Sequence, residues 1–447
     1  MQPTGIDAAG HVPGLLWAAP FLGVLASIAL LPAMAPRFWH RRMAWVAGFW
    51  CLVLLVPLGI ATTPANAAAT AWHAILVEYL PFITLLLALF TAGGGVLVRG
   101  GLSGTPTGNT ALLAIGTALA GVMGTTGAAM VLIHPLLRAN AHRERKMHLA
   151  LFFIVLVANA GGAMSPLGDP PLYLGYLRGV PFFWPATHLG LPLAVAAGLL
   201  LVGFWILDYA LARTEPAPPP REKLHIRGWG NAALVLLIGA TVLVLGAAEL
   251  GTVSIAGQVI GVGRLASIGV FVVVSALSAA LTPRAIHQGN DFVWHPMIEV
   301  ALLFVAIFIT IEPVLHMLQA GEAGPFAPVL RLTTDAHGTP LPVAYFWLTG
   351  GISAFLDNAP TYLVFFEMAG IHPDSLNTVR SLELEAISAG AVFFGALTYI
   401  GNAPNMMVRA IAAHRGVRMP GFFGFMGMAA LLLLPVFAVL TAVFFQS

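Results

Sequence analysis

Long apolar runs constrain this chain more than any other feature. Several of them reach or exceed the roughly 20 apolar residues with which a helix crosses a bilayer. Only 9% of the 447 residues are charged, against about 25% in a soluble domain, so a soluble core could not bury this much apolar surface. The sequence therefore predicts an all-α, polytopic membrane protein.

The apolar runs fall into two groups of six on either side of a polar linker at about 211–230, whose centre reads "EPAPPPREK". A Pro-rich, charged segment of this kind is typical of a linker. We therefore expect one unit over residues 1–210 and a second over 231–447. The runs lie at about 14–34, 44–63, 74–98, 110–137, 149–177 and 186–210, and then at about 231–250, 264–281, 296–319, 341–369, 383–412 and 421–445.

Basic residues indicate which loops face the cytoplasm, where Lys and Arg are enriched. The first loop holds three arginines between residues 37 and 42, and the linker holds four basic residues. Basic residues also flank the run at 110–137 on both sides, so we expect it to enter and leave the membrane from the cytoplasm as a re-entrant hairpin. Both termini then lie outside, the linker lies inside, and all but four of the 20 Lys and Arg fall inside; the exceptions are Arg178, Arg264, Arg331 and Arg380.

Each group then crosses the membrane five times and holds one hairpin, so the second group is inverted relative to the first. "SPLGDPP" (165–171) and "TYIGNAP" (398–404) share the pattern [ST]-x-[LI]-G-[DN]-x-P. We expect hairpins at about 110–137 and 341–369, broken helices at about 149–177 and 383–412, and about ten membrane-spanning helices. Inverted repeats with broken helices that meet near the midplane are typical of secondary transporters.

Two aspartates lie inside apolar runs, each beside prolines that interrupt a helix. Asp169 directly precedes Pro170 and Pro171, and Asp357 lies three residues before Pro360. An Asp at the bilayer centre costs roughly 2.5–3.5 kcal/mol on insertion scales and is by default a functional candidate. The alternative is an ion pair at the same depth, but no basic residue is predicted there. Carboxylates and freed backbone carbonyls suit a hard cation such as Na⁺.

Polar side chains near these breaks complete the predicted ion site. They are Asn159, Ser165, Ser353, Asn358, Thr361, Thr398, Asn402 and Asn405, with Thr125 and Thr126 at the tip of the first hairpin. Each also has a structural interpretation, because Asn caps broken helices and Thr hydroxyls bond to helix carbonyls. The sequence has no phosphate-binding loop and no Cys/His metal cluster, so we expect no cofactor and an ion gradient as the energy source.

Three motifs carry a family resemblance. "NAGGAMSPLGDPP" (159–171), "SAFLDNAPTY" (353–362) and "GNAPN" (401–405) resemble the ion transporter superfamily, and within it the NhaD-type sodium/proton antiporters. Arsenite exporters and sodium-coupled carboxylate carriers are relatives of these. The resemblance covers nearly the whole chain in segment order. It implies two hairpin tips and two broken helices around a central ion site, in a homodimer of the bacterial inner membrane with a scaffold and a moving transport domain.

One position departs from the antiporter pattern. NhaD-like proteins usually carry an Asp-Asn pair in the first hairpin, where this chain has Gly124, Thr125, Thr126 and Gly127. This tip is closer to the Ser-Asn-Thr tip of the carboxylate carriers. The substrate and the coupling ratio are therefore both open at this point.

The residues and the resemblance together favour exchange of Na⁺ or Li⁺ for protons. Burial favours the protonated form of Asp169 and Asp357, and a bound cation favours the ionised form, so the two ions compete. The alternative is Na⁺-coupled uptake of a carboxylate such as citrate, held by Thr125, Thr126 and the helix N-termini; export of arsenite or another oxyanion is a variant. Two acids without an arginine disfavour a multiply charged anion.

Two further classes of protein share parts of this pattern. An intramembrane aspartyl protease would use two aspartates, but Pro166, Leu167 and Gly168 replace its Gly-x-Gly before Asp169. A channel stays open as an alternative, which saturating, counterflow-stimulated flux would exclude. We expect a transporter rather than an enzyme, with the lipid bilayer and the transported ions as partners and no nucleic acid.

Overall fold

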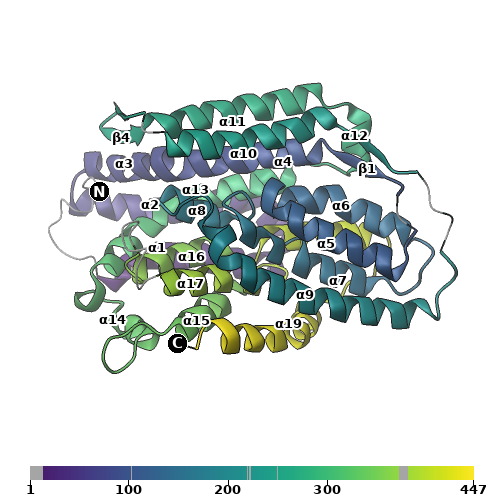
Figure 1. The fold of residues 1–447 in the computed structure, drawn as a ribbon. Coiled ribbons are helices and arrows are strands. Elements are labelled where there is room, and N and C mark those ends of the chain that lie inside the picture. The colour runs from purple at the N-terminus through teal and green to yellow at the C-terminus, as the bar shows by residue number, and fades with distance from the viewer. Residues whose placement is uncertain are drawn as a thin grey trace.

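The computed structural model describes residues 14–101, 103–218, 220, 223–248, 250–371 and 381–446. Long helices run roughly parallel to one another through the molecule (Figure 1). Within these ranges nine helices are long and apolar enough to cross a membrane. The second broken helix, which contains α17 and α18, is not among them. The prediction of an all-α, polytopic membrane protein is confirmed.

The first half of the chain is helical except for one short strand. Its third helix begins at Pro64 rather than near residue 74 as predicted, because the Thr63 hydroxyl caps it by accepting a hydrogen bond from Asn66 N at 3.1 Å. The elements are η2 (Leu15–Ala18), α1 (Ala19–Met34), α2 (Pro36–Ala61), α3 (Pro64–His73), the π-helix η3 (Ala74–Tyr79), α4 (Leu80–Gly94), β1 (Leu97–Arg99), α5 (Pro106–Met123), α6 (Thr125–Ala139), α7 (Met147–Leu156), η4 (Ala160–Met164), α8 (Pro170–Leu177) and α9 (Trp184–Ala212).

The second half begins within the linker, where β2 pairs with β1 as an antiparallel ribbon with Leu97 opposite Arg227. A second ribbon joins β3 to β4. The elements are β2 (His225–Arg227), α10 (Trp229–Ala247), β3 (Thr252–Ile255), β4 (Gln258–Gly261), α11 (Val262–Leu281), α12 (Arg284–Gly289), α13 (His295–Gln319), η5 (Gly321–Ala323), α14 (Ala327–Leu330), η6 (Arg331–Thr333), α15 (Pro342–Ser353), α16 (Asn358–Met368), α17 (Ser381–Phe394), η8 (Gly395–Leu397), α18 (Ala403–His414) and α19 (Phe422–Phe444).

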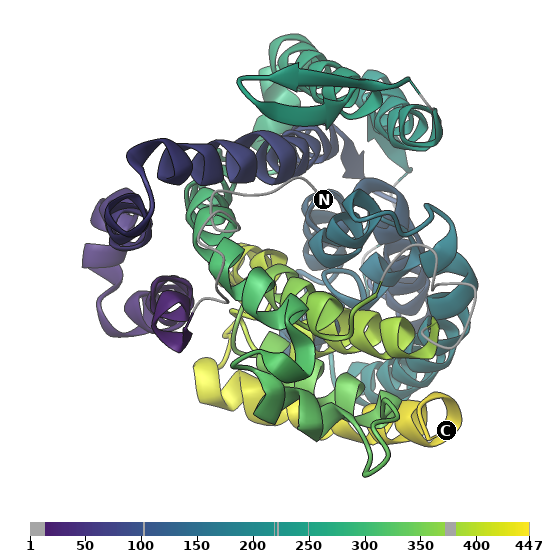
Figure 2. The ribbon, with the colours of Figure 1, turned by 90° about the vertical axis from the view of Figure 1, so that its left-hand side faces the viewer.

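The helices pack into two sets. The first, here called the frame, contains α1, α2, α3–η3–α4, α10, α11 and α13; the second, here called the core set, contains α5 to α9 and α15 to α19. In Figure 2 the frame curves along the left and the top, and most of the core set lies to the right and below. The two sets meet mainly where α4 packs on α6 and where α13 packs on α16.

Two helical hairpins enter the core set from opposite ends of the molecule. In the first, α5 and α6 meet at Gly124, whose φ of 78° requires glycine. Its open end lies beside the C-terminus of α9 and the linker, here called the linker end. In the second, α15 and α16 open near the start of α9. Because α9 has 29 residues, it separates the two ends by about 43 Å at 1.5 Å per residue.

Candidate ion-binding site

Asp169 lies at the centre of the molecule, between η4 and α8, with 1% of its surface exposed. Three neutral groups donate hydrogen bonds to its carboxylate: Thr125 Oγ1 at 3.2 Å, Asn402 Nδ2 at 3.0 Å and Asn358 Nδ2 at 2.5 Å. None of the ion pairs in the described part of the chain includes Asp169. A buried carboxylate held only by neutral donors needs a proton or a cation to offset its charge.

Close contact between backbone segments breaks the helix on either side of the site. A Cβ on Gly168 would lie 2.2 Å from Gly162 O, and a Cβ on Gly401 would lie 2.7 Å from Gly395 O. Both distances are too short for any side chain. Pro170 then starts α8 immediately after Asp169, because proline is favourable in the first turn of a helix. These glycines and Pro170 therefore favour the non-helical segments that carry Asp169 in the first half and Asn402 in the second.

The hairpin tips are tied to the breaks by equivalent hydrogen bonds in the two halves. Ser165 Oγ donates to Gly121 O, and Thr398 Oγ1 donates to Ala354 O; each bond joins residues 44 positions apart. This common spacing aligns Thr125 with Asn358, Asp169 with Asn402, and Gly124 with Asp357. Each half therefore contributes one acid, but on different parts: the break in the first half and the hairpin tip in the second.

Other predicted residues join the two breaks to each other. Asn159 Nδ2 donates to Asn405 Oδ1 at 2.7 Å, and Asn402 Nδ2 donates to Ala158 O at 3.2 Å. The hydroxyls of Ser353 and Thr361 donate to backbone carbonyls: Ser353 Oγ donates to Ala391 O and Thr361 Oγ1 to Asp357 O. The last two hydroxyls therefore hold the second hairpin in place rather than pointing toward Asp169.

Two buried amide oxygens at this site lack hydrogen-bond donors. Asn159 Oδ1 and Asn358 Oδ1 belong to side chains with 0% exposure, and neither has a partner in the described structure. Asp357 accepts a hydrogen bond from Ala359 N at 3.1 Å and caps α16. Carboxylate and amide oxygens are the ligands that hard cations such as Na⁺ prefer. These carboxylate and amide oxygens at the centre of the molecule therefore fit an alkali cation as its ligands.

A cavity of about 70 Å³ borders the site. Its core-set wall holds Asp169, Asp357, Asn402 and the hairpin tip at 124–127, and its frame wall is apolar, with Leu85, Phe90, Met297, Val300 and Phe304 among its residues. None of the described residues that line the cavity is Lys, Arg or His. Since a water needs roughly 10–15 Å³ in this measure, the cavity has room for an ion with a few waters.

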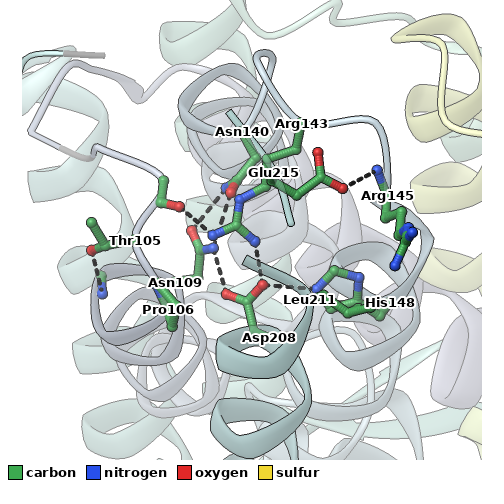
Figure 3. Close-up of polar contacts among 12 residues, drawn as sticks. Thr105, Pro106, Asn109, Asn140, Arg143, Arg145, His148, Asp208, Leu211 and Glu215 are labelled. Carbon is green, nitrogen blue, oxygen red and sulfur yellow. Dashed lines mark hydrogen bonds and ion pairs between the residues drawn. The ribbon is translucent and has the colours of Figure 1, made fainter. Parts of the chain in front are cut away.

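A second buried polar cluster, which the sequence did not predict, lies at the base of the first hairpin (Figure 3). Asp208 of α9 is fully buried and forms an ion pair with Arg143. It also accepts hydrogen bonds from Asn109 Nδ2 and His148 Nε2, both at 2.9 Å. Asn140 exchanges hydrogen bonds with Asn109 at 3.0 and 2.8 Å. The carboxylate of Asp208 therefore links α9 to α5, to α7 and to the segment after α6.

The family of the chain was established by comparison with protein families. A family model described as "Putative citrate transport" matches residues 10–445. The chain belongs to this citrate-transport family. The family lies in the ion transporter superfamily, so that part of the predicted resemblance is confirmed, whereas the NhaD-type antiporter assignment is not. A search of curated protein sequences found no match. The citrate-family membership and the nine apolar helices identify a multi-pass membrane transporter.

Proposed function

We propose that this citrate-family protein is a secondary transporter that couples citrate movement to a cation, Na⁺ or H⁺, bound by Asp169 and Asp357. The observation that carries the proposal is the surroundings of Asp169. Its carboxylate is buried, three neutral donors from both halves of the chain orient it, and no ion pair in the described structure neutralises it. A cation or proton supplies the missing charge, and its binding is coupled to the shape of both hairpin tips.

The first hairpin tip is the part of the cavity best suited to a carboxylate of citrate. Thr126 is half-buried and lines the cavity at the start of α6, a helix of 15 residues. Helix N-termini favour anions because their first N–H groups and the helix dipole face the ligand. Gly124 has no side chain, whereas the equivalent position in the second half is Asp357. An acid at that point would repel the anion.

Coupling follows from charge. Citrate is a trianion when fully ionised, and it would lie beside two aspartates in a cavity whose described lining has no basic side chain. Like charges in such a confined site repel strongly. Cation binding at Asp169 and Asp357 removes this repulsion, so loading the cation makes citrate binding favourable. Repulsion by the two ionised acids therefore disfavours citrate binding without the cation, and this makes the coupling obligatory.

The arrangement of the two sets suits movement of the core set against the frame. Both hairpins and both breaks belong to the core set, and the frame wall of the cavity is apolar. The cavity lies beside Pro296 to Phe304, the half of α13 nearest the linker end, which the basic residues assign to the cytoplasm. We propose an elevator-type cycle in a homodimer of the bacterial cytoplasmic membrane, with both termini outside.

Exchange of Na⁺ or Li⁺ for protons without citrate is the second candidate. Its support is the small cavity, whose volume of about 70 Å³ suits an ion better than a tricarboxylate in this conformation. The same two carboxylates would then bind a proton and a metal ion in turn.

Transport by proteoliposomes separates these candidates. Labelled citrate and an internal pH dye are followed while Na⁺, Li⁺, K⁺ or Mg²⁺ is added, for the wild type, Asp169→Asn and the exposed-acid control Glu322→Gln. Citrate uptake that needs a cation or a pH gradient, and that Asp169→Asn abolishes, supports the first proposal. Proton release driven by Na⁺ or Li⁺ with no citrate present supports the second. Citrate uptake retained by Asp169→Asn contradicts the first role for this carboxylate, and proton release retained by that variant contradicts the second.

A further inference from the structure

A buried ionic cluster joins four elements at the end of the molecule opposite the linker. Arg178, just after α8, donates through Nη1 to Glu78 Oε2 at 3.0 Å and through Nε to Glu367 Oε1 at 3.0 Å. Gln319 Nε2 donates to the other oxygen of Glu367 at 3.1 Å. The three charged side chains are only 10–15% exposed. The cluster lies outside the ion site, and neither the family match nor the proposed function uses it.

The cluster crosses the boundary between the two sets. Glu78 and Gln319 belong to the frame, whereas Arg178 and Glu367 belong to the core set. Glu78 lies in the π-helix η3, and π-helical turns within α-helices occur frequently at functional sites. Next to it, Arg264 of the frame donates to Leu177 O, the last residue of α8, at 2.7 Å. The end of α8 is therefore held to the frame on two sides.

At the linker end the two sets are held together differently. Arg415, which follows α18 of the core set, pairs with Asp291, between α12 and α13, at 3.1 Å, but these side chains are 34% and 39% exposed. An exposed ion pair contributes little because water screens it. Among the ion pairs of the described residues that join the two sets, Glu78–Arg178 is the one in which both side chains are mostly buried, and it lies at the end away from the cavity. An ion pair therefore holds the two sets together at the end opposite the linker, whereas the cavity lies toward the linker end.

We propose that the Glu78–Arg178 pair is a latch that holds the core set in the conformation whose ion site faces the linker end. Opening of the site toward the opposite end separates Arg178 from Glu78 and Glu367 from Gln319, while Glu367 moves with Arg178 and keeps it paired. Arg178, Glu78 and Glu367 are positioning residues, since none contacts the ion site. This inference rests on the proposed movement of the core set but does not depend on which substrate is carried.

Thiol accessibility tests the latch without any transport measurement. In a Cys51→Ala, Met407→Cys background, the new thiol lies in the cavity, and Cys51 is the single native cysteine. The initial rate of labelling by a membrane-impermeant maleimide is measured from the linker side, in inside-out vesicles. Glu78→Gln, which breaks the pair between the sets, is expected to slow labelling about threefold through a shift in population.

Glu367→Gln is the matched control, because Glu367 is as buried as Glu78 and its charged contact with the same guanidinium lies within the core set. Its amide oxygen can still accept the hydrogen bond from Gln319 of the frame. It is expected to leave the labelling rate close to that of the parent, as is the exposed Glu322→Gln. If Glu78→Gln does not fold, Glu78→Asp, which keeps the charge and shortens the reach, is expected to slow labelling to a smaller extent. Equal labelling rates for the Glu78 variants and the parent, or an equal change in Glu367→Gln, would overturn the latch.

Discussion

The two buried ionic clusters of this transporter use the same chemistry for different purposes. The Asp208 cluster joins α5, α7 and α9, all within the core set. The Arg178 cluster joins the core set to the frame. A buried pair within one unit fixes its shape, whereas a pair between two units sets the balance between conformations. The comparison shows that the elements a buried charge connects, rather than its burial, decide what it does.

The largest expected effect is on folding, from Asp208→Asn. This change leaves the Arg143 guanidinium buried without its carboxylate, and breaking a buried pair in this way costs about 3–5 kcal/mol. Thermal unfolding of the purified protein should show a large fall in melting temperature, with the exposed Glu322→Gln as the unchanged control. A melting temperature close to that of the wild type would remove the distinction between the two clusters.

Glu78→Gln should have a smaller effect on stability, although Glu78 also pairs with a buried arginine. Arg178 keeps its second carboxylate, Glu367, so only one charged hydrogen bond is lost, at about 1.5–3 kcal/mol. The same unfolding experiment measures it. A loss as large as that of Asp208→Asn would mean that the Arg178 cluster serves folding as well, and that the two clusters do not differ as described.

His148→Phe sharpens the comparison within the Asp208 cluster. Phenylalanine keeps the aromatic packing of His148 on Phe204, whose ring centroid lies 6.0 Å away, but removes the hydrogen bond to Asp208. Since Arg143 and Asn109 still satisfy the carboxylate, the free energy of unfolding should fall by only about 1.5 kcal/mol, the low end for a hydrogen bond to a charged group. A loss equal to that of Asp208→Asn would show that the histidine, rather than the arginine, dominates the cluster.

The smallest effect concerns Glu215, at the margin of the Asp208 cluster (Figure 3). Backbone hydrogen bonds from Glu144 N and Arg145 N lower the pKa of Glu215. A lowered pKa means that the ionised form stabilises this loop above the ordinary Glu pKa of about 4.3, and that this contribution is lost as the pH falls through the folded value.

Hydrogen exchange measures this contribution at the two amides. Protection at residues 144 and 145, corrected for intrinsic exchange rates, should decrease on acidification in the wild type. It should be low and independent of pH in Glu215→Gln. Unchanged protection in that variant would show that the loop is held by other contacts.

The sequence was sufficient to find the helix breaks and the acids beside them. Asp169 and Asp357 are visible because an acid inside an apolar run next to proline is rare, and the repeated Gly-Asp/Asn motif pairs the two halves. The helical fold follows from the same apolar runs. The motif order indicated the superfamily but did not decide between antiport and carboxylate transport, because the short motifs are shared by antiporters and carboxylate carriers.

The two ionic clusters could not be predicted in the same way. Arg143 and Asp208 are 65 positions apart, and Glu78 and Arg178 are 100 apart. All four lie near the ends of predicted helices, where charged residues are ordinarily solvated. Only the packing of hairpins against α9 and of α8 against the frame brings them together. The start of α3 at Pro64 was likewise missed, because its alanine-rich first turns are only weakly apolar.

The most direct test of the central claim is cation-dependent stabilisation of the purified protein. Melting temperature is measured with citrate present, once as Na⁺ is added at alkaline pH and once as the pH is lowered without Na⁺. A ligand at 100 times its Kd stabilises the folded state by about 2.7 kcal/mol. The account predicts that at least one cation raises the melting temperature of the wild type and of Glu322→Gln, and that neither does so in Asp169→Asn. Full stabilisation of Asp169→Asn would contradict the assignment of this carboxylate as the site of the coupling cation.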